Sequence, residues 1–226
     1  MAGCYPIAWS KGLIKLLYKG KSVNELNNFR DITILSCLGK VFDQILNLRL
    51  AKWVESLNIL YNTQAGFRKN FSTEDNIFVL NTLITKSRYD GQKLYCAFID
   101  YKKAFNSVYR EGLWYKLMRY GCRGRLLKLL ISMYSNTVSC IQTKEGITEF
   151  FKSFIGVQQG AVLSPLLFSL YVNDLNEALL DRDGVFMDDI SIKVLLYADD
   201  LVLVLNTIDG FKTILTDYMI TAPNGN

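Results

Sequence analysis

Apolar residues recur at every third or fourth position in several stretches of the chain, which is the spacing of amphipathic helices. Helices are predicted over the ranges 40–57, 73–86, 124–135, 164–180 and 209–220, and in a stretch that ends at Gly121. Ser164 and Pro165 mark one start clearly, because Ser caps a helix N-terminus and Pro fits the first helical turn. We expect most apolar residues of 40–57 in the core. One face of 73–86 should carry Ile77, Leu80, Leu83 and Ile84.

Shorter apolar runs, rich in β-branched and aromatic residues, predict strands. These runs are Ile32–Leu35, Leu94–Asp100, a hairpin over 137–153, and a buried hairpin over 193–205 with a tight turn at Ala198-Asp199-Asp200. Helices are therefore mixed with strands around an antiparallel hairpin. The sequence predicts an α+β fold.

The Asp199-Asp200 pair has two interpretations. Asp is common in turns, so turn chemistry alone explains the pair. Two negative charges held against a hydrophobic core are nevertheless costly unless a cation lies beside them. Mg²⁺ is the natural candidate, because this hard cation prefers carboxylate oxygens.

Composition narrows the chemistry that the chain can perform. Its 226 residues form one large domain or two small ones, and a net charge of +5 is compatible with a polyanionic partner. The chain contains no histidine, which excludes Ser-His-Asp and Cys-His catalysis and His-ligated zinc. Five scattered cysteines without a Cys-x-x-Cys pair favour reduced thiols in an intracellular protein. Neither a signal peptide nor a run of transmembrane length is recognisable.

Asp100 ends the strand Leu94–Asp100 and lies 99 residues before Asp199. Both strands are apolar enough to be central in one sheet, and if they are neighbours their carboxylates meet at one edge. Nucleotidyl transfer needs two metal ions about 3.5–4 Å apart, held by carboxylates, and it needs no histidine. The residues themselves thus lead to a two-metal carboxylate hypothesis without a named reaction.

Three ordered motifs add a family resemblance. They are Phe-Ile-Asp-Tyr-Lys-Lys-Ala-Phe at 98–105, Gly-Val-Gln-Gln-Gly-Ala-Val-Leu-Ser-Pro-Leu-Leu-Phe at 156–168 and Tyr-Ala-Asp-Asp at 197–200. In order and spacing this set resembles the palm motifs of reverse transcriptases, in the variant of non-LTR (LINE-type) retrotransposons. The segments 28–36, 39–42 and 64–68 are similar to the fingers of that family, so that the resemblance covers about residues 9–206.

The resemblance implies a right-hand polymerase, an RNA-directed DNA polymerase with fingers and a palm whose antiparallel sheet carries the catalytic residues. Asp100, Asp199 and Asp200 would bind two Mg²⁺ ions, with Mn²⁺ as an alternative. The implied nucleotide-binding residues are Tyr101, Phe105, Gln159, Gly160, Arg30 and Lys19, and the implied template-binding residues are Arg68 and Lys69. Phe105 would exclude a 2′-hydroxyl, although an ordinary core aromatic is the plainer interpretation. Each basic residue alone is more commonly a solvated surface charge.

Three departures from the family pattern leave the metal ligands intact. Asn106 stands where Asp is common, Asp31 where Pro is usual, and Ala161-Val162 where Cys-Pro is usual. We expect one reverse transcriptase domain over 1–226. Fingers and palm helices would occupy about 9–93 and parts of 107–155, and the palm core would occupy about 94–106 and 156–206. Only 26 residues follow Asp200, so we expect that the thumb is absent, as is any endonuclease domain.

The expected partners are an RNA template, a DNA primer and dNTPs, with no membrane; protein partners are open. We expect an intracellular location, with cytoplasm and nucleus both open. Two alternatives remain: a nucleic-acid-binding fragment with weak or no catalysis, and an RNA-templated RNA polymerase. Phe105 disfavours the second, because a small residue there would suit ribonucleotides better.

Overall fold

The computed structural model describes residues 4–20, 22, 24–179, 184–187, 189–210 and 212–213. Of the predicted helix over 209–220, residues 209, 210, 212 and 213 are described and helical, and the rest lies outside the described residues. The chain forms two compact units. We call Met1–Ser56 with Phe105–Leu167 the first unit, and Leu57–Ala104 with Phe168–Asn226 the second unit. The division into fingers and palm ranges remains a prediction.

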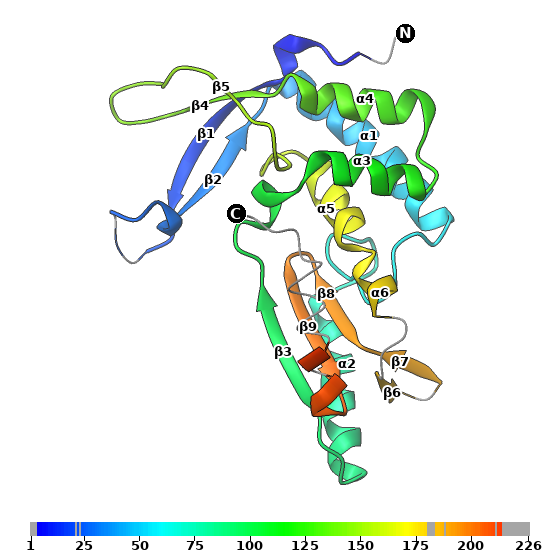
Figure 1. Cartoon of the computed structure of the whole chain (residues 1–226). Helices are drawn as coiled ribbons and strands as arrows, with labels where there is room; N and C mark the ends of the chain where they lie inside the picture. Colours follow the sequence, from blue (N-terminus) through cyan, green and yellow to red (C-terminus); the bar gives the residue numbers. More distant parts are fainter. Residues whose placement is uncertain are drawn as a thin grey trace. The chain divides into compact units, whose positions relative to one another are not determined.

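The first unit contains a four-stranded sheet (Figure 1) in the order β2-β1-β4-β5. Its strands are β1 Lys11–Tyr18, β2 Phe29–Ile34, β4 Val138–Ile141 and β5 Phe151–Lys152. β1 pairs antiparallel with β2 and parallel with β4, and β4 pairs antiparallel with β5. The hairpin predicted over 137–153 is confirmed, whereas its parallel connection to β1 was not predicted.

The α-helices of the first unit are α1 Cys37–Ser56, α3 Arg110–Arg119, α4 Gly124–Ser135 and the start of α5 Ser164–Val172. Its 3₁₀ helices are η1 Ile7–Trp9, η2 Leu26–Asn28 and η3 Ala104–Ser107. The first residue of η3 belongs to the second unit. α3 and α4 pack side by side in Figure 1. One prediction for α1 is wrong: Leu46, Leu50 and Val54 are buried, but Val41 and Ile45 are exposed. Apolar residues of α1 thus lie both on the face that packs into the core and on faces that are exposed to solvent.

The second unit is built on a three-stranded antiparallel sheet in the order β3-β9-β8. Its strands are β3 Tyr95–Asp100, β8 Val194–Tyr197 and β9 Asp200–Leu205, beside a small hairpin of β6 Val185–Met187 and β7 Ile190–Ile192. The strands predicted from 94–100 and 193–205 are therefore confirmed. They are also neighbours, which is the condition under which their carboxylates were expected to meet.

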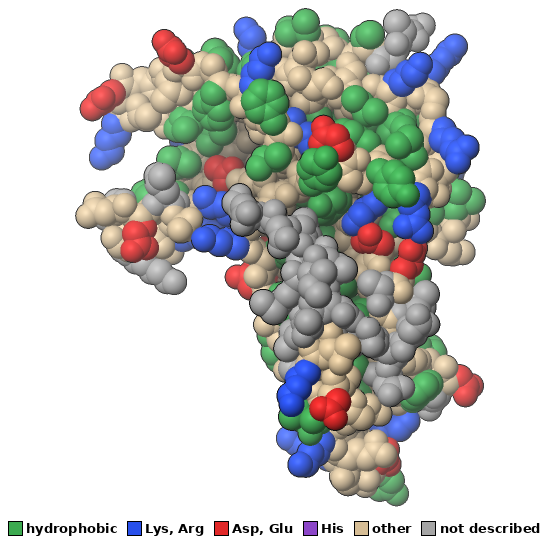
Figure 2. Space-filling model, viewed as in Figure 1, with side chains coloured by type: hydrophobic (Ala, Val, Ile, Leu, Met, Phe, Trp, Pro, Cys, Tyr) green, Lys and Arg blue, Asp and Glu red, His purple; other side chains and the backbone are tan. Residues whose placement is uncertain are grey.

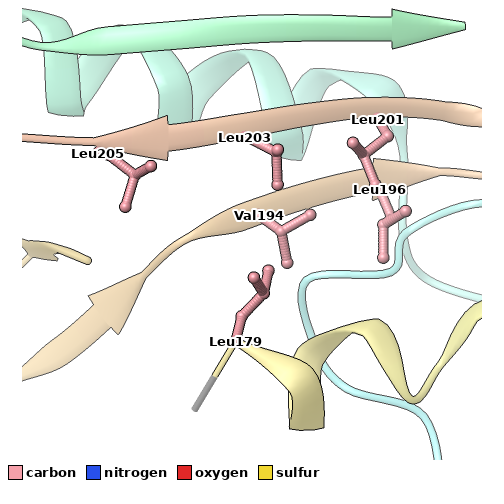
Figure 3. Packing of buried hydrophobic residues seen from close by; sticks show 6 residues of the cluster. All are labelled: Leu179, Val194, Leu196, Leu201, Leu203 and Leu205. Atoms are coloured by element: carbon pink, nitrogen blue, oxygen red, sulfur yellow. The ribbon is translucent and has the colours of Figure 1, made fainter. Parts of the chain in front are cut away.

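Both faces of this sheet are covered by apolar packing. Figure 3 shows the cluster on one face: Leu179, Val194, Leu196, Leu201, Leu203 and Leu205, all buried. The other face packs Leu195 and Val204 against Leu83 of α2 Thr73–Tyr89. Ser72 begins α2 in a capping box with Asp75. On the predicted apolar face of α2, Leu83 is buried whereas Ile77 is exposed.

The helix predicted over 164–180 is interrupted. It forms α5 Ser164–Val172 and a short α6 Leu175–Ala178. Asn173, at the break, is buried and bonded to the segment before α2: its Nδ2 donates to the Ile59 carbonyl at 2.8 Å and its Oδ1 accepts from Tyr61 N at 3.1 Å. A buried polar side chain needs such partners, and no periodicity of apolar residues reveals them.

Charged side chains of both signs lie among hydrophobic ones on the face shown in Figure 2, and histidine is absent. Hydrophobic side chains reach the surface over α3, where Tyr109 precedes the helix and Tyr115 lies within it. Within the ranges that the structure describes, no helix is both long enough and apolar enough to span a bilayer.

Candidate active site

Asp100 and Asp200 face each other across two neighbouring strands. Asp100 is the last residue of β3 and Asp200 is the first residue of β9, and the antiparallel register pairs them directly. Side chains directly opposite in such a pair have Cβ atoms about 4.5–5.5 Å apart, and like charges there are destabilising. Both carboxylates are exposed at this end of the sheet. A cation would relieve their repulsion.

Asp199 lies in the two-residue turn between β8 and β9. Ala198 precedes it with φ +59°, the left-handed region that a residue with a Cβ rarely adopts. Asp199 is half-buried, whereas Ala198 is almost fully buried. The turn places Asp199 beside Asp200 along the chain, so that all three predicted carboxylates belong to one end of one sheet in the second unit.

The donor set suits a magnesium ion in its chemistry. Among the described residues, no three Asp, Glu or Cys side chains converge closely enough to enclose an ion. Mg²⁺ does not require such an enclosure, because it keeps several waters and is commonly bound through one or two carboxylates together with substrate phosphates. Two opposed carboxylates with a third in the adjoining turn fit this mode of binding.

Arg30 and Lys19, assigned to nucleotide phosphates, lie at the same end of the β1–β2 pair in the first unit. Arg30 on β2 pairs with Leu17 on β1. Lys19 follows β1, and its backbone N–H donates to the Asn28 carbonyl at 2.8 Å. Both side chains are exposed. The structure thus brings these two predicted cations to one end of a hairpin.

The Gln159-Gly160 loop is fixed to β2. Thr33 N donates to the Gln159 carbonyl at 2.7 Å, and Gly160 has φ +121°. A Cβ on Gly160 would come within 2.5 Å of the Thr33 carbonyl oxygen, so only glycine fits here. The same loop is bonded to η3, because Val157 N donates to the Phe105 carbonyl at 2.7 Å. Phe105, Gln159 and β2 therefore belong to one connected part of the first unit.

A pocket of about 290 Å³ opens beside these elements. Its lining includes Asp31, Thr33, Asn106 and Gln159. Asn106 Nδ2 donates to Asp31 Oδ2 at 2.8 Å. Asn106 and Asp31 are two of the departures from the family pattern, and the structure shows that they are partners. An amide at 106 suits a carboxylate at 31, whereas two carboxylates would repel each other.

Asn106→Asp is therefore expected to destabilise the protein by about 1–3 kcal/mol at neutral pH, because it removes the donor and opposes two carboxylates. Their repulsion raises the carboxyl pKa in the folded variant, so the loss appears as the pH rises above about 4 and shrinks below it. Urea unfolding at neutral pH and again below about pH 4 measures this loss of stability. Asp31→Asn added to the variant restores one donor and one acceptor. An equal loss at both pH values would contradict the explanation.

Three further predicted residues lie in the second unit. Tyr101 follows β3, and its ring meets that of Phe168 edge to face with centroids 6.0 Å apart. Arg68 Nη1 donates to the main-chain carbonyls of Tyr61 at 2.9 Å and Gln64 at 3.1 Å. Lys69 is exposed. The guanidinium of Arg68 thus holds its own loop, whatever else it contacts.

Sequence reasoning missed a buried carboxylate in the first unit. Asp43 in α1 accepts from the backbone N–H groups of Val162 at 2.7 Å and Leu163 at 3.2 Å, just before α5. Burial raises the pKa of Asp43, and these two donors lower it in part. Burial, together with the nearby Asp43, raises the pKa of Tyr5 to about 12. Helical spacing places residue 43 in α1 without revealing these contacts.

An antiparallel sheet whose adjoining strands present carboxylates at one end is the arrangement expected of a polymerase palm. Solved structures show the same fold. An apo telomerase from Candida Tropicalis, truncated from its C-terminal domain, matches with a TM-score of 0.65 at 17% identity over 93% of this chain and 46% of its own. An RNA-dependent RNA polymerase of bacteriophage phi12 matches with a TM-score of 0.54 at 13% identity over 86% and 31%.

The chain belongs to the reverse transcriptase (RNA-dependent DNA polymerase) family, whose model matches residues 18–222. Relatives include the probable RNA-directed DNA polymerase from transposon X-element of Drosophila melanogaster, 28% identical over 83% of the chain and 21% of the relative. The type-1 retrotransposable element R2 polyprotein of Popillia japonica is 29% identical over 90% and 28%. The chain thus spans about a quarter of the relatives' length.

These findings confirm the resemblance to non-LTR retrotransposon enzymes and the α+β polymerase fold. The chain is a reverse transcriptase domain by its family. Polymerases of this family depend on divalent metal ions in general. The roles of individual residues follow as proposals.

Proposed function

We propose that this chain adds deoxynucleotides to the 3′-hydroxyl of a DNA primer along an RNA template, with Mg²⁺ held by Asp100, Asp199 and Asp200. One observation carries the proposal: the β3–β9 register sets Asp100 directly against Asp200 at the end where Asp199 turns. We also propose an intracellular location, because the proposed substrates, RNA and dNTPs, are intracellular molecules.

The carboxylates would act by holding charge in position rather than by forming covalent bonds. Bound metal ions would lower the pKa of the attacking 3′-hydroxyl and neutralise the leaving pyrophosphate. Asp100 and Asp200, from two strands of one sheet, would present their oxygens on a rigid base, and Asp199 would add a third from the turn. Mn²⁺ has the same oxygen-ligand preference and is an expected substitute.

The first unit would select and orient the nucleotide. Arg30 and Lys19 are exposed cations suited to triphosphate oxygens, and Arg offers two parallel donors to a phosphate. Gln159 and Gly160 would line the nucleotide pocket, and the backbone after Asp100, from Tyr101 onward, would approach the triphosphate. For the template strand, we assign contacts to Arg68 and Lys69.

The test is primer extension on an RNA template with Mg²⁺, comparing dNTPs with rNTPs. We expect incorporation of dNTPs, its loss on chelation of the metal, and little incorporation of rNTPs. Salt-dependent binding of primer–template by the folded protein without any incorporation would overturn the proposal in favour of a binding-only fragment. Preference for rNTPs would instead indicate an RNA polymerase.

Phe105→Val should relax the choice of sugar. Phe105 would act as a steric filter against the 2′-hydroxyl, and a pocket contact of about that size discriminates by about 10- to 100-fold. We expect rNTP incorporation to rise by that factor relative to dNTP, measured as the ratio of the two kcat/KM values. Phe78→Val, which changes an exposed aromatic of α2 in the other unit, is the control and should leave the ratio unchanged. An unchanged ratio in Phe105→Val would assign Phe105 to the core alone.

A further inference from the structure

Gln64 connects the fingers-like motif Gln64–Arg68 to the catalytic turn. Its side-chain Oε1 accepts from Ala198 N at 3.2 Å and from Gly66 N at 2.9 Å. Ala198 is the residue immediately before Asp199. One amide oxygen therefore joins the backbone of two segments 134 residues apart, and one of them carries the proposed metal ligands.

Backbone hydrogen bonds continue this connection along β8. Leu196 N donates to the Thr63 carbonyl at 2.8 Å, and Ala65 N donates to the Leu196 carbonyl at 2.9 Å. They form a parallel bridge between Gln64 and Leu196. Residues 63–66, which we call the Gln64 brace, thus lie beside β8 through an isolated parallel bridge near the end that carries the turn.

Gly66 is required for this close approach. A Cβ at position 66 would overlap the backbone nitrogen of Ala198 and would come within 2.9 Å of the Ala198 Cα. Backbone atoms cannot move aside as a flexible side chain can, so only glycine allows the brace to lie against the turn. The small residue Ala65, also buried, completes the contact.

The brace also accounts for the conformation of Ala198. A non-glycine residue in the left-handed region costs about 1–2 kcal/mol and persists only when its surroundings fix it. Ala198 has φ +59° and donates its N–H to Gln64 rather than to water. The hydrogen bond from Ala198 to Gln64, a residue outside the hairpin, thus helps to fix this unfavourable backbone conformation.

Gln64 itself is fully buried at a cost. Its exposed fraction is 0%, and its Nε2 is a buried donor with no hydrogen-bond partner in the structure. An apolar side chain of the same size would avoid this cost, which is about 1–3 kcal/mol for an unpaired buried donor. The acceptor oxygen is the part of the side chain that is used, and what it holds is the catalytic turn.

We propose that Gln64 and Gly66 are positioning residues that fix the Ala198–Asp199 turn, and through it the metal-binding geometry of Asp199 and Asp200. The link to metal binding rests on the function proposed above, whereas the bond from Ala198 to Gln64 does not. Arg68 supports the brace, because its guanidinium bonds the carbonyls of Tyr61 and Gln64 and lies 4.1 Å from the centre of the Phe71 ring.

The direct test is amide hydrogen exchange at Ala198, with Gln64→Met as the variant. Met has nearly the same volume and no amide oxygen. We expect the exchange of Ala198 N–H to accelerate by at least about tenfold more than that of Leu196 N–H, whose acceptor Thr63 O is unchanged. Because both amides lie in one hairpin, their ratio removes the effect of a general loss of stability.

Metal binding and turnover give the functional measurement. We expect Gln64→Met to weaken Mn²⁺ binding, followed by electron paramagnetic resonance, and to lower kcat of primer extension, each by about 10- to 100-fold, as loss of an outer-shell partner does. KM for dNTP should change little. Lys193→Met is the matched control, because it removes a side-chain bond to the Leu179 carbonyl from the other end of the same hairpin. It should leave all three measurements unchanged.

Gln64→Glu keeps an acceptor oxygen at the same position and should retain the slow exchange of Ala198. It also decides the question if Gln64→Met is too unstable to study, because fast exchange in Gln64→Glu would contradict the acceptor role. Equal effects of Gln64→Met and Lys193→Met would overturn the proposal. If the unmodified chain neither binds Mn²⁺ nor extends a primer, the proposed function fails, while the exchange ratio still decides whether Gln64 holds the turn.

Discussion

Asp199→Ala is expected to abolish detectable dNTP incorporation, lowering the rate by about 10³-fold or more. The proposed metal ions supply several kcal/mol of charge stabilisation to the transition state, and each 1.36 kcal/mol lost is about tenfold in rate. Asp199 lies in the turn beside Asp200, which is itself opposed to Asp100. The remaining pair would still attract a cation, but it lacks the third carboxylate.

Stability provides a second measurement for Asp199→Ala that does not depend on turnover. A ligand that binds the folded state raises stability by RT ln(1 + [L]/Kd), so Mg²⁺ should raise the unfolding midpoint of the unmodified chain. The variant should gain less from Mg²⁺. Without metal it should be as stable as the unmodified chain or slightly more so, because one of several neighbouring negative charges is gone.

Asp90→Ala is the matched control for Asp199→Ala. Asp90 is an exposed carboxylate at the C-terminal cap of α2 in the same unit. Its removal should affect neither incorporation nor the response to Mg²⁺. Incorporation by Asp199→Ala at a rate within tenfold of the unmodified chain would show that Asp199 is not a principal metal ligand.

The second unit was largely predictable from sequence because its strands are short, apolar and bounded by turn residues. The apolar runs that end at Asp100 and flank Asp199 predicted the strands, which β3, β8 and β9 confirm, and allowed but did not require that they pair. Carboxylates at the ends of such strands are visible in the sequence as charges that interrupt an apolar pattern.

Contacts between segments distant in sequence were not predictable in the same way. The parallel pairing of β1 with β4 joins residues about 127 positions apart, and no local pattern records it. Apolar spacing in α1 does not distinguish Leu50, which is buried, from Val41, which is exposed. The Gln64 brace has only a weak signal in the sequence: a polar residue followed by Ala65 and Gly66 permits the close approach of two backbones.

Arg110 also escaped sequence reasoning, although it organises a large part of the first unit. It is only 6% exposed at the start of α3. Its guanidinium donates to four main-chain carbonyls: Gly156 at 2.8 Å, Tyr134 at 2.9 Å, Ser153 at 2.7 Å and Ile155 at 3.2 Å. Burial lowers the pKa of Arg110, yet a guanidinium remains charged in proteins. These bonds hold the segment that leads into the Gln159-Gly160 loop.

Arg110→Met should therefore lower the free energy of unfolding by about 3–5 kcal/mol. The substitution keeps an apolar stem but removes the guanidinium donor from the buried carbonyls of Gly156 and Tyr134 and from the partly buried carbonyl of Ser153. Each unsatisfied buried group costs about 1–3 kcal/mol. Arg110→Lys should cost less, although one ammonium cannot reproduce the planar, forked donors of Arg. Urea unfolding at neutral pH measures both losses.

Arg125→Met in α4 is the control for Arg110→Met, since Arg125 is exposed and a surface substitution changes stability by about 0.5 kcal/mol or less. A loss below about 1 kcal/mol in Arg110→Met would mean that water replaces the guanidinium at these carbonyls. Suppose that Arg110→Met shows the full loss of unfolding free energy, while the β1–β2 hairpin is still protected from amide hydrogen exchange just below the unfolding midpoint. This result would show that the 153–156 segment opens first. The Gln159-Gly160 loop would then depend on a cation that holds the main chain leading into it.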